Sequence, residues 1–165
     1  MDTKNLFDAF GYFETMLAKN KLASKESFKF CRVTGLSGME EALDSLPEKA
    51  FFCVDDAVSG VTFARNGGFF QRRVFTVFVL KRHDFGDMPG RAVSMAVCRK
   101  LANQTLSKMI LDSEELGNDL IYLNTSSIKF QETESYALSG CAGLYFVVAV
   151  DEPIDLSYDE EQWTE

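Results

Sequence analysis

Two strand-like apolar segments flanking a tight turn constrain the fold more than any other feature of this chain. The segments are residues 58–65 and 69–82, and the turn between them is residues 66–68, Asn-Gly-Gly. Asn and Gly tolerate positive φ, so this spacing predicts a β-hairpin with antiparallel strands. Residues 74–80 of the second strand are apolar on both faces, which indicates a central strand covered on two sides. Its start is Gln-Arg-Arg, residues 71–73, so we expect that end to project into solvent or towards a partner.

The remaining elements follow from periodicity. Apolar residues at spacings of three and four predict an amphipathic helix over residues 6–17. Ser37 followed by Glu40 and Glu41 is typical of a capping box that opens a short helix ending at residue 46. The longest helix is expected over residues 91–111. Further strands are expected at residues 28–33, 50–54 and 144–150, with one interrupted strand over residues 119–123 and 127–133.

These elements indicate a single α+β domain. The 165 residues suffice for one domain with a substantial core, which the 15 Phe should dominate. Adjacent strands joined by short turns predict a mostly antiparallel, twisted sheet, with the N-terminal helix and the long helix packed on one face. We expect the domain to cover residues 1–153 and an acidic C-terminal tail to cover residues 154–165.

Charge is divided unevenly along the chain. Residues 151–165 contain seven acidic and no basic side chains, whereas residues 65–108 contain nine basic and two acidic ones. The acidic tail argues against nucleic acid as the main partner, since such binding depends on neutralising phosphates. The basic middle remains able to face a polyanion locally. The tail of one subunit docking on the basic middle of another is a second reading, and two solvated faces without a specific partner are a third.

Three further features of the sequence bear on the cellular compartment of the protein. No apolar run reaches the roughly 20 residues that a membrane-spanning helix needs. The N-terminus has no apolar core typical of a signal peptide, so we expect neither secretion nor a membrane partner. The four cysteines are far apart without CxxC spacing, which favours buried free thiols over disulfides and gives no support to a zinc site. They are Cys31, Cys53, Cys98 and Cys141.

Catalytic chemistry has few candidates. His83 is the only histidine, and it follows a predicted strand beside Asp84. Asp55 and Asp56 end another strand just before a turn, where catalytic acids and ordinary turn formers both occur. A nuclease-like site would pair them with an acid-x-Lys motif ending at Lys81, but Val79 stands in place of the second acid. A hydrolase or nuclease using Asp55, Asp56 or His83 is therefore the third reading of function.

Nothing in the chain predicts a cofactor or a metal. The glycines of residues 140–143 lack the GK[ST] ending of a phosphate loop and precede a strand rather than a helix. We expect these glycines to allow a turn, a bulge or a close backbone contact. Trp163 lies in the acidic tail after Ile154, Leu156 and Tyr158, which alternate. This pattern favours Trp163 as an anchor for another surface.

The chain resembles the small tail-completion or tail-terminator proteins of bacteriophages and prophages over about residues 4–155. The resemblance rests on element order, on the hairpin RNGGFFQRRVFTVFVLKR, the long helix RAVSMAVCRKLANQTLSKMIL and the ending SGCAGLYFVVAVDEPID. It implies a non-enzymatic structural protein without a cofactor, which forms a ring, caps or joins a tail tube, and resides in the bacterial cytoplasm or the virion. Its partners would be further copies of itself and other tail or assembly proteins; an interaction module of another bacterial system is the alternative.

That resemblance gives the charge division a use. Basic side chains of the hairpin in one subunit would meet the acidic tail of its neighbour in a head-to-tail ring. The residues expected at this subunit interface are Arg65, Arg72, Arg73, Asp155, Tyr158, Asp159, Glu160, Glu161 and Trp163.

Overall fold

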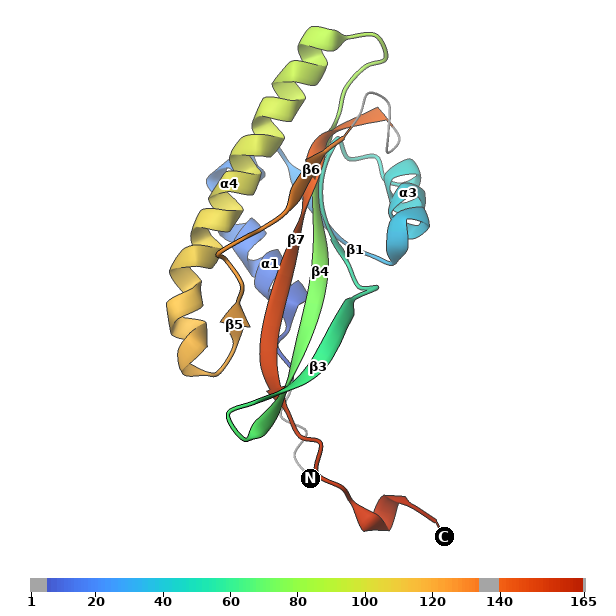
Figure 1. Ribbon diagram of the computed structural model, residues 1–165. Helices are drawn as coiled ribbons and strands as arrows, with labels where there is room; N and C mark the ends of the chain where they lie inside the picture. Colours follow the sequence, from blue (N-terminus) through green and yellow to red (C-terminus); the bar gives the residue numbers. More distant parts are fainter. Residues whose placement is uncertain (1–5, 134–139, 165) are drawn as a thin grey trace.

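A computed structural model describes residues 6–133 and 140–164. Within these ranges the chain forms helices on both faces of one seven-stranded sheet (Figure 1). The helices are α1 Ala9–Lys19, α2 Lys21–Lys25, α3 Gly35–Ser45, α4 Met88–Asn118 and the 3-10 turn η1 Glu160–Gln162. The strands are β1 Phe28–Val33, β2 Ala50–Asp55, β3 Ser59–Arg65, β4 Gly68–Arg82, β5 Tyr122–Leu123, β6 Phe130–Glu132 and β7 Cys141–Ile154.

The sheet is built around the long antiparallel pair of β4 and β7. The main strand order is β1-β2-β4-β7-β5, with β3 also paired to β4 and β6 also paired to β7. Every pair is antiparallel except β1 with β2, which run parallel. A parallel pair needs a crossover connection, and α3 supplies it. The expected α+β fold with a mostly antiparallel sheet is confirmed.

Each face of the sheet has its own apolar core. On the first, the α1/α4 face, α1 and α4 cover Phe52, Phe75 and Phe146, all essentially inaccessible to solvent. On the second, the α3 face, Met39 and Leu43 of α3 pack over a smaller cluster that contains Phe51, Cys53, Phe78, Leu80 and Cys141. The N-terminal and long helices share one face, as expected, and the short helix lies on the other.

The boundaries of three helices differ from the sequence analysis. The N-terminal helix covers Ala9–Lys19 rather than residues 6–17. The short helix begins at Gly35, so Thr34 occupies the N-cap position without a side-chain cap bond, and the capping box expected at Ser37 is wrong. The long helix begins earlier than expected because the Asp87 carboxylate caps it, accepting a hydrogen bond from Gly90 N at 2.9 Å. It also continues beyond residue 111 to Asn118.

Candidate interaction surface

The expected hairpin extends from the sheet as a two-stranded ribbon, defined here as residues 59–73. The reason lies in the pairing of β4: β2 pairs only with its second half, residues 77–81, whereas β3 pairs with residues 68–74. The ribbon therefore continues past the last residue of β2. No ribbon residue belongs to the buried cluster beneath α3, and Figure 1 shows β3 reaching away from that helix. In β3 every side chain is exposed except Phe63, which is half-buried.

Arginine and aromatic side chains gather on the α3 face of the ribbon. Phe63 lies opposite Phe70 in the ladder, and their rings stack with centroids 6.1 Å apart. The Arg65 guanidinium lies 5.5 Å from the centre of the Phe70 ring and 4.7 Å from that of Tyr122 on β5. The Arg72 guanidinium lies 5.7 Å from the Phe63 ring. Arginine and aromatic residues are enriched in protein–protein interfaces, and a guanidinium over an aromatic ring is a favourable contact.

Two of the three ribbon arginines form ion pairs within their own subunit. Arg72 donates two hydrogen bonds to the Asp151 carboxylate, at 2.6 and 2.8 Å, and this contact raises the pKa of Arg72 above its ordinary value. Arg73 donates to Glu152 at 2.6 Å. The antiparallel register of β4 with β7 sets both contacts, since Arg72 lies directly opposite Asp151. Charge that the sequence analysis assigned to contact with a neighbour's tail is thus partly neutralised inside the subunit.

Arg65 differs from the other two arginines. In the ranges that the structure describes, no carboxylate forms an ion pair with it, and its contacts are with aromatic rings. It is also exposed. Of the three arginines expected at the interface, Arg65 therefore offers the most accessible charge.

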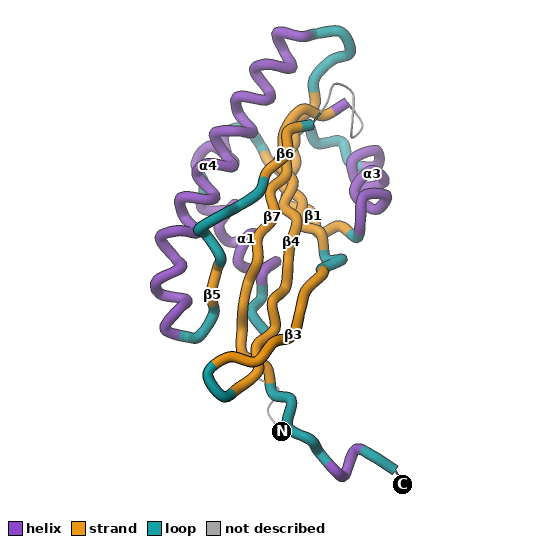
Figure 2. Tube along the Cα trace, in the orientation of Figure 1, coloured by secondary structure: helices purple, strands orange, loops and turns teal. Residues whose placement is uncertain are grey.

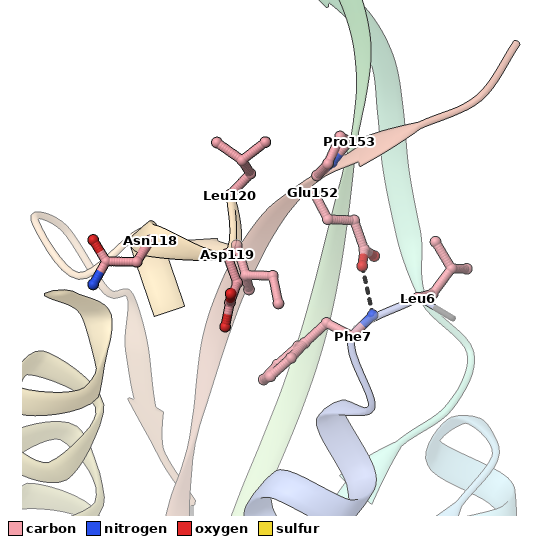
Figure 3. A pocket seen from close by; sticks show the side chains of 8 residues that line it. Leu6, Phe7, Asn118, Asp119, Leu120, Glu152 and Pro153 are labelled. Atoms are coloured by element: carbon pink, nitrogen blue, oxygen red, sulfur yellow. Dashed lines mark hydrogen bonds between the residues drawn. The ribbon is translucent and has the colours of Figure 1, made fainter. Parts of the chain in front are cut away.

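A cavity of about 410 Å³ lies at the same end of the molecule on the α1/α4 face. In the close view of Figure 3, Phe7 and Glu152 meet within it, and Leu120 and Asp119 border it from the other side. Glu152 accepts a hydrogen bond from Phe7 N at 2.6 Å, and Arg73 donates to Phe7 O at 2.6 Å. This buried network fixes the chain ahead of α1 against the sheet. Both Glu152 oxygens are engaged, and polar and apolar groups line the cavity in similar measure.

The C-terminal tail begins beside the hairpin turn, because Ile154 at the end of β7 lies opposite Phe69 of β4. Residues 155–164, called the arm below, then run away from the body as loop with one short helical turn (Figures 1 and 2). The Asp155 and Asp159 carboxylates accept hydrogen bonds from Ser157 N and Glu161 N, within the arm itself. Exposed apolar side chains follow one another along it: Leu156 at 53%, Tyr158 at 74% and Trp163 at 68%.

The ribbon and the arm therefore meet at one end, and all interface residues expected from the sequence lie there. Tyr158 and Trp163 stack on each other with ring centroids 6.1 Å apart. Glu160 and Glu161 are exposed within η1, and Asp159 caps that turn. Whether these residues contact a neighbour stays a prediction.

The residues proposed for catalysis do not come together. Asp55 accepts hydrogen bonds from Gly35 N and Ala57 N and shapes the turn after β2. Lys81 pairs with Ala50 at the opposite end of β2, and His83 follows just beyond it. Lys81 instead forms an ion pair with Glu26. The acid–lysine arrangement of a nuclease-like site is thus separated by the length of a strand.

Asp56 has a structural role at the same turn. Its carboxylate accepts a hydrogen bond from the Thr34 hydroxyl at 2.6 Å and contacts Arg32 at 3.1 Å. These two contacts, Thr34 first, hold the pKa of Asp56 below its ordinary value. The turn residues after β1 and β2 are thereby tied together.

The four cysteines are buried, as expected, and free. Burial raises the pKa of the Cys98 thiol to about 12 and that of Cys141 to about 11, so both stay protonated at neutral pH. Across residues 6–133 and 140–164, no group of three or more His, Cys, Asp or Glu side chains is placed to hold a metal ion. A Cβ at Gly143 would lie 2.0 Å from Val79 O, which confirms the close backbone contact expected for this glycine segment.

No protein-family model and no curated protein sequence matches this chain. None of the helices in the described part of the chain combines the length and the apolar character that crossing a membrane requires.

Proposed function

We propose that the protein is a non-enzymatic structural protein that associates with copies of itself through its ribbon end, as a tail component of phage or prophage type that joins or caps a tail tube. One observation carries the proposal. The ribbon and the arm leave the core at the same end and expose large apolar side chains together with arginine, on surfaces that none of the described helices covers. Exposed apolar side chains grouped in this way mark interaction sites.

The asymmetry of this end suits ring assembly. The ribbon lies on one side of the subunit's end and the acidic arm leaves it, so the two surfaces differ from each other in charge and shape. Two unlike surfaces on one subunit give head-to-tail contacts, which close into a ring when the rotation between neighbours permits. A closed ring is an architecture suited to a protein that caps or joins a tube.

Negative-stain electron microscopy of the full chain at low salt tests the proposal. We expect closed rings of uniform diameter. Val61→Glu places a charge on the exposed apolar side of β3 and should abolish them, whereas Val93→Glu, at a similarly exposed site on α4, should leave them intact. Dispersed monomers at high concentration, or open filaments, would count against a ring-forming tail component.

A further inference from the structure

We propose that the arm of one copy binds as an added strand along the open edge of β3 in a second copy. This inference rests on the proposed self-association and specifies which segment meets which edge. Addition of a strand to an exposed sheet edge is a common mode of peptide binding, in which main-chain hydrogen bonds supply affinity and alternate side chains supply specificity.

The edge of β3 is open and unprotected. Among the described strands, β3 pairs only with β4, so its other edge carries backbone N–H and C=O groups without a strand partner. Its sequence, Ser-Gly-Val-Thr-Phe-Ala-Arg, has no Pro, no Lys and no acidic residue, and its register with β4 has no bulge. Proteins usually block edges of this length by such devices. Apart from Arg65 at its end, β3 lacks these devices, which indicates an edge that a partner covers.

The arm has the pattern of a strand that faces an apolar surface on one side. In Asp155–Asp159 the apolar Leu156 and Tyr158 alternate with polar residues, and successive side chains of a strand point to opposite faces. No proline follows Pro153. Leu156 and Tyr158 stay exposed in their own subunit, where the arm runs away from the body. An arm that leaves these side chains uncovered gains most by burying them elsewhere.

Charge selects the ribbon over the cavity as the docking site. The arm contains four acidic residues in its described part and no basic one: Asp155, Asp159, Glu160 and Glu161. The ribbon contains Arg65, Arg72 and Arg73 and no acidic residue, whereas Asp119 and Glu152 border the cavity. Along β3 the arm would lay Leu156 and Tyr158 beside Val61 and Phe63. In an extended strand Glu160 falls on the same face as these two side chains, and Arg65 falls on the same face as Val61 and Phe63, so this carboxylate and this guanidinium would share one face.

The topology favours a second copy over the subunit's own edge. The arm leaves from β7, and β7 and β3 flank β4 on opposite sides. To reach its own β3, the arm would have to reverse direction around the hairpin turn. A neighbouring subunit can accept the same arm without this reversal.

Trp163 provides the test, because it is the only tryptophan in the chain and stacks on Tyr158. Tryptophan emission and light-scattering mass are measured on the same samples of full-length protein over a dilution series. We expect the emission maximum to move to shorter wavelength as mass increases, and to return on dilution. Val61→Glu should abolish both changes, and Val93→Glu should retain both.

Cysteine crosslinking locates the contact directly. Differently tagged full-length chains carrying Tyr158→Cys or Val61→Cys are mixed and oxidised, and the native cysteines are buried. We expect a mixed disulfide between the two chains, and a several-fold loss of this product when Val93→Cys replaces Val61→Cys.

Each contrary outcome is distinct. An increase in mass without a change in emission, and without the mixed disulfide, overturns arm docking but leaves self-association standing. A short-wavelength emission at every concentration with monomeric mass shows that the arm folds back on its own subunit, which overturns the exchange. Monomeric mass with long-wavelength emission at every concentration overturns both this inference and the proposed function.

Discussion

The two halves of β4 show how one strand serves both the core and the surface. Its second half, which pairs with β2, is covered by α3 on one face and by α1 and α4 on the other. Its first half pairs with β3 in the ribbon, and none of the described helices covers the hairpin turn that joins the two strands. Burial in the covered half supplies folding stability, and exposure in the ribbon half leaves surface for association.

The largest contrast is expected between two phenylalanines on β4 itself. Phe75 is 1% exposed and lies edge-on to Phe10 of α1, whereas Phe69 is 48% exposed at the ribbon tip. Phe75→Ala should lower the free energy of unfolding by about 3–5 kcal/mol, because it removes buried apolar area and leaves a cavity. Phe69→Ala should cost about 1 kcal/mol or less. Urea denaturation measures both, and equal losses would show that the ribbon belongs to the folding core.

Breaking the buried ion pair at the base of the ribbon should cause the second-largest loss in the free energy of unfolding. The side chains of Arg73 and Glu152 are 14% and 4% exposed, so Arg73→Ala leaves a carboxylate buried without its cation and should cost about 3 kcal/mol. Replacing both residues by Met should recover much of that loss. Arg99→Ala, which breaks the exposed pair with Glu132, should change the urea midpoint very little. A larger effect at Arg99 than at Arg73 would contradict this ranking.

The rate at which a thiol reagent labels the cysteines tests whether the covered half is closed to solvent. Cys53, Cys98 and Cys141 are inaccessible, and burial contributes to a raised pKa at each of them. Cys31 is 9% exposed, and its hydrogen bond with Cys53 lowers its pKa. An aromatic disulfide reagent should therefore label Cys31 first in the native protein, and Cys31→Ala should remove that fast phase. Rapid labelling of all four thiols without denaturant would show that the covered half is open.

The smallest effect is expected from pH. The hydrogen bond from Lys81 holds the pKa of Glu26 below its ordinary value of 4.5. A lowered pKa in the folded state contributes stability above the ordinary value, and this contribution is lost as pH falls below it. Glu26→Gln should therefore lower Tm slightly at pH 7, with the difference from the unsubstituted protein disappearing towards pH 3. A difference that grows on acidification would reverse the assigned sign.

The sequence predicts where the helices and strands lie better than it predicts which strands pair. The hairpin around residues 66–68 and the strand at residues 28–33 lie where turn chemistry and alternation placed them, because both signals are local. The parallel pairing of β1 with β2 was not predicted, since it depends on α3 crossing to the second face. The start of α3 was misplaced because Thr34 competes with Ser37 for the N-cap position, and only packing decides between two such residues.

The ion pairs of the ribbon could not be predicted without knowing the register between two strands that are far apart in the sequence. Arg72 and Arg73 are 79 residues away from Asp151 and Glu152, and composition alone assigned these charges to opposite regions. The sequence did contain one signal for these ion pairs. Two cations lie near the start of one strand, and two carboxylates lie near the end of another. An antiparallel pairing of those strands places them together, which local patterns cannot specify.

The mass of the full chain in solution, measured by light scattering after size exclusion at low and high salt, tests the central claim most directly. Contacts between acidic arms and Arg65 are screened by salt, while apolar contacts on the ribbon are not. We therefore expect one closed oligomer at low salt that loosens at high salt, and a smaller species for a chain ending at Ile154. A monomer at every salt and concentration, with or without the arm, would contradict self-association through the ribbon end.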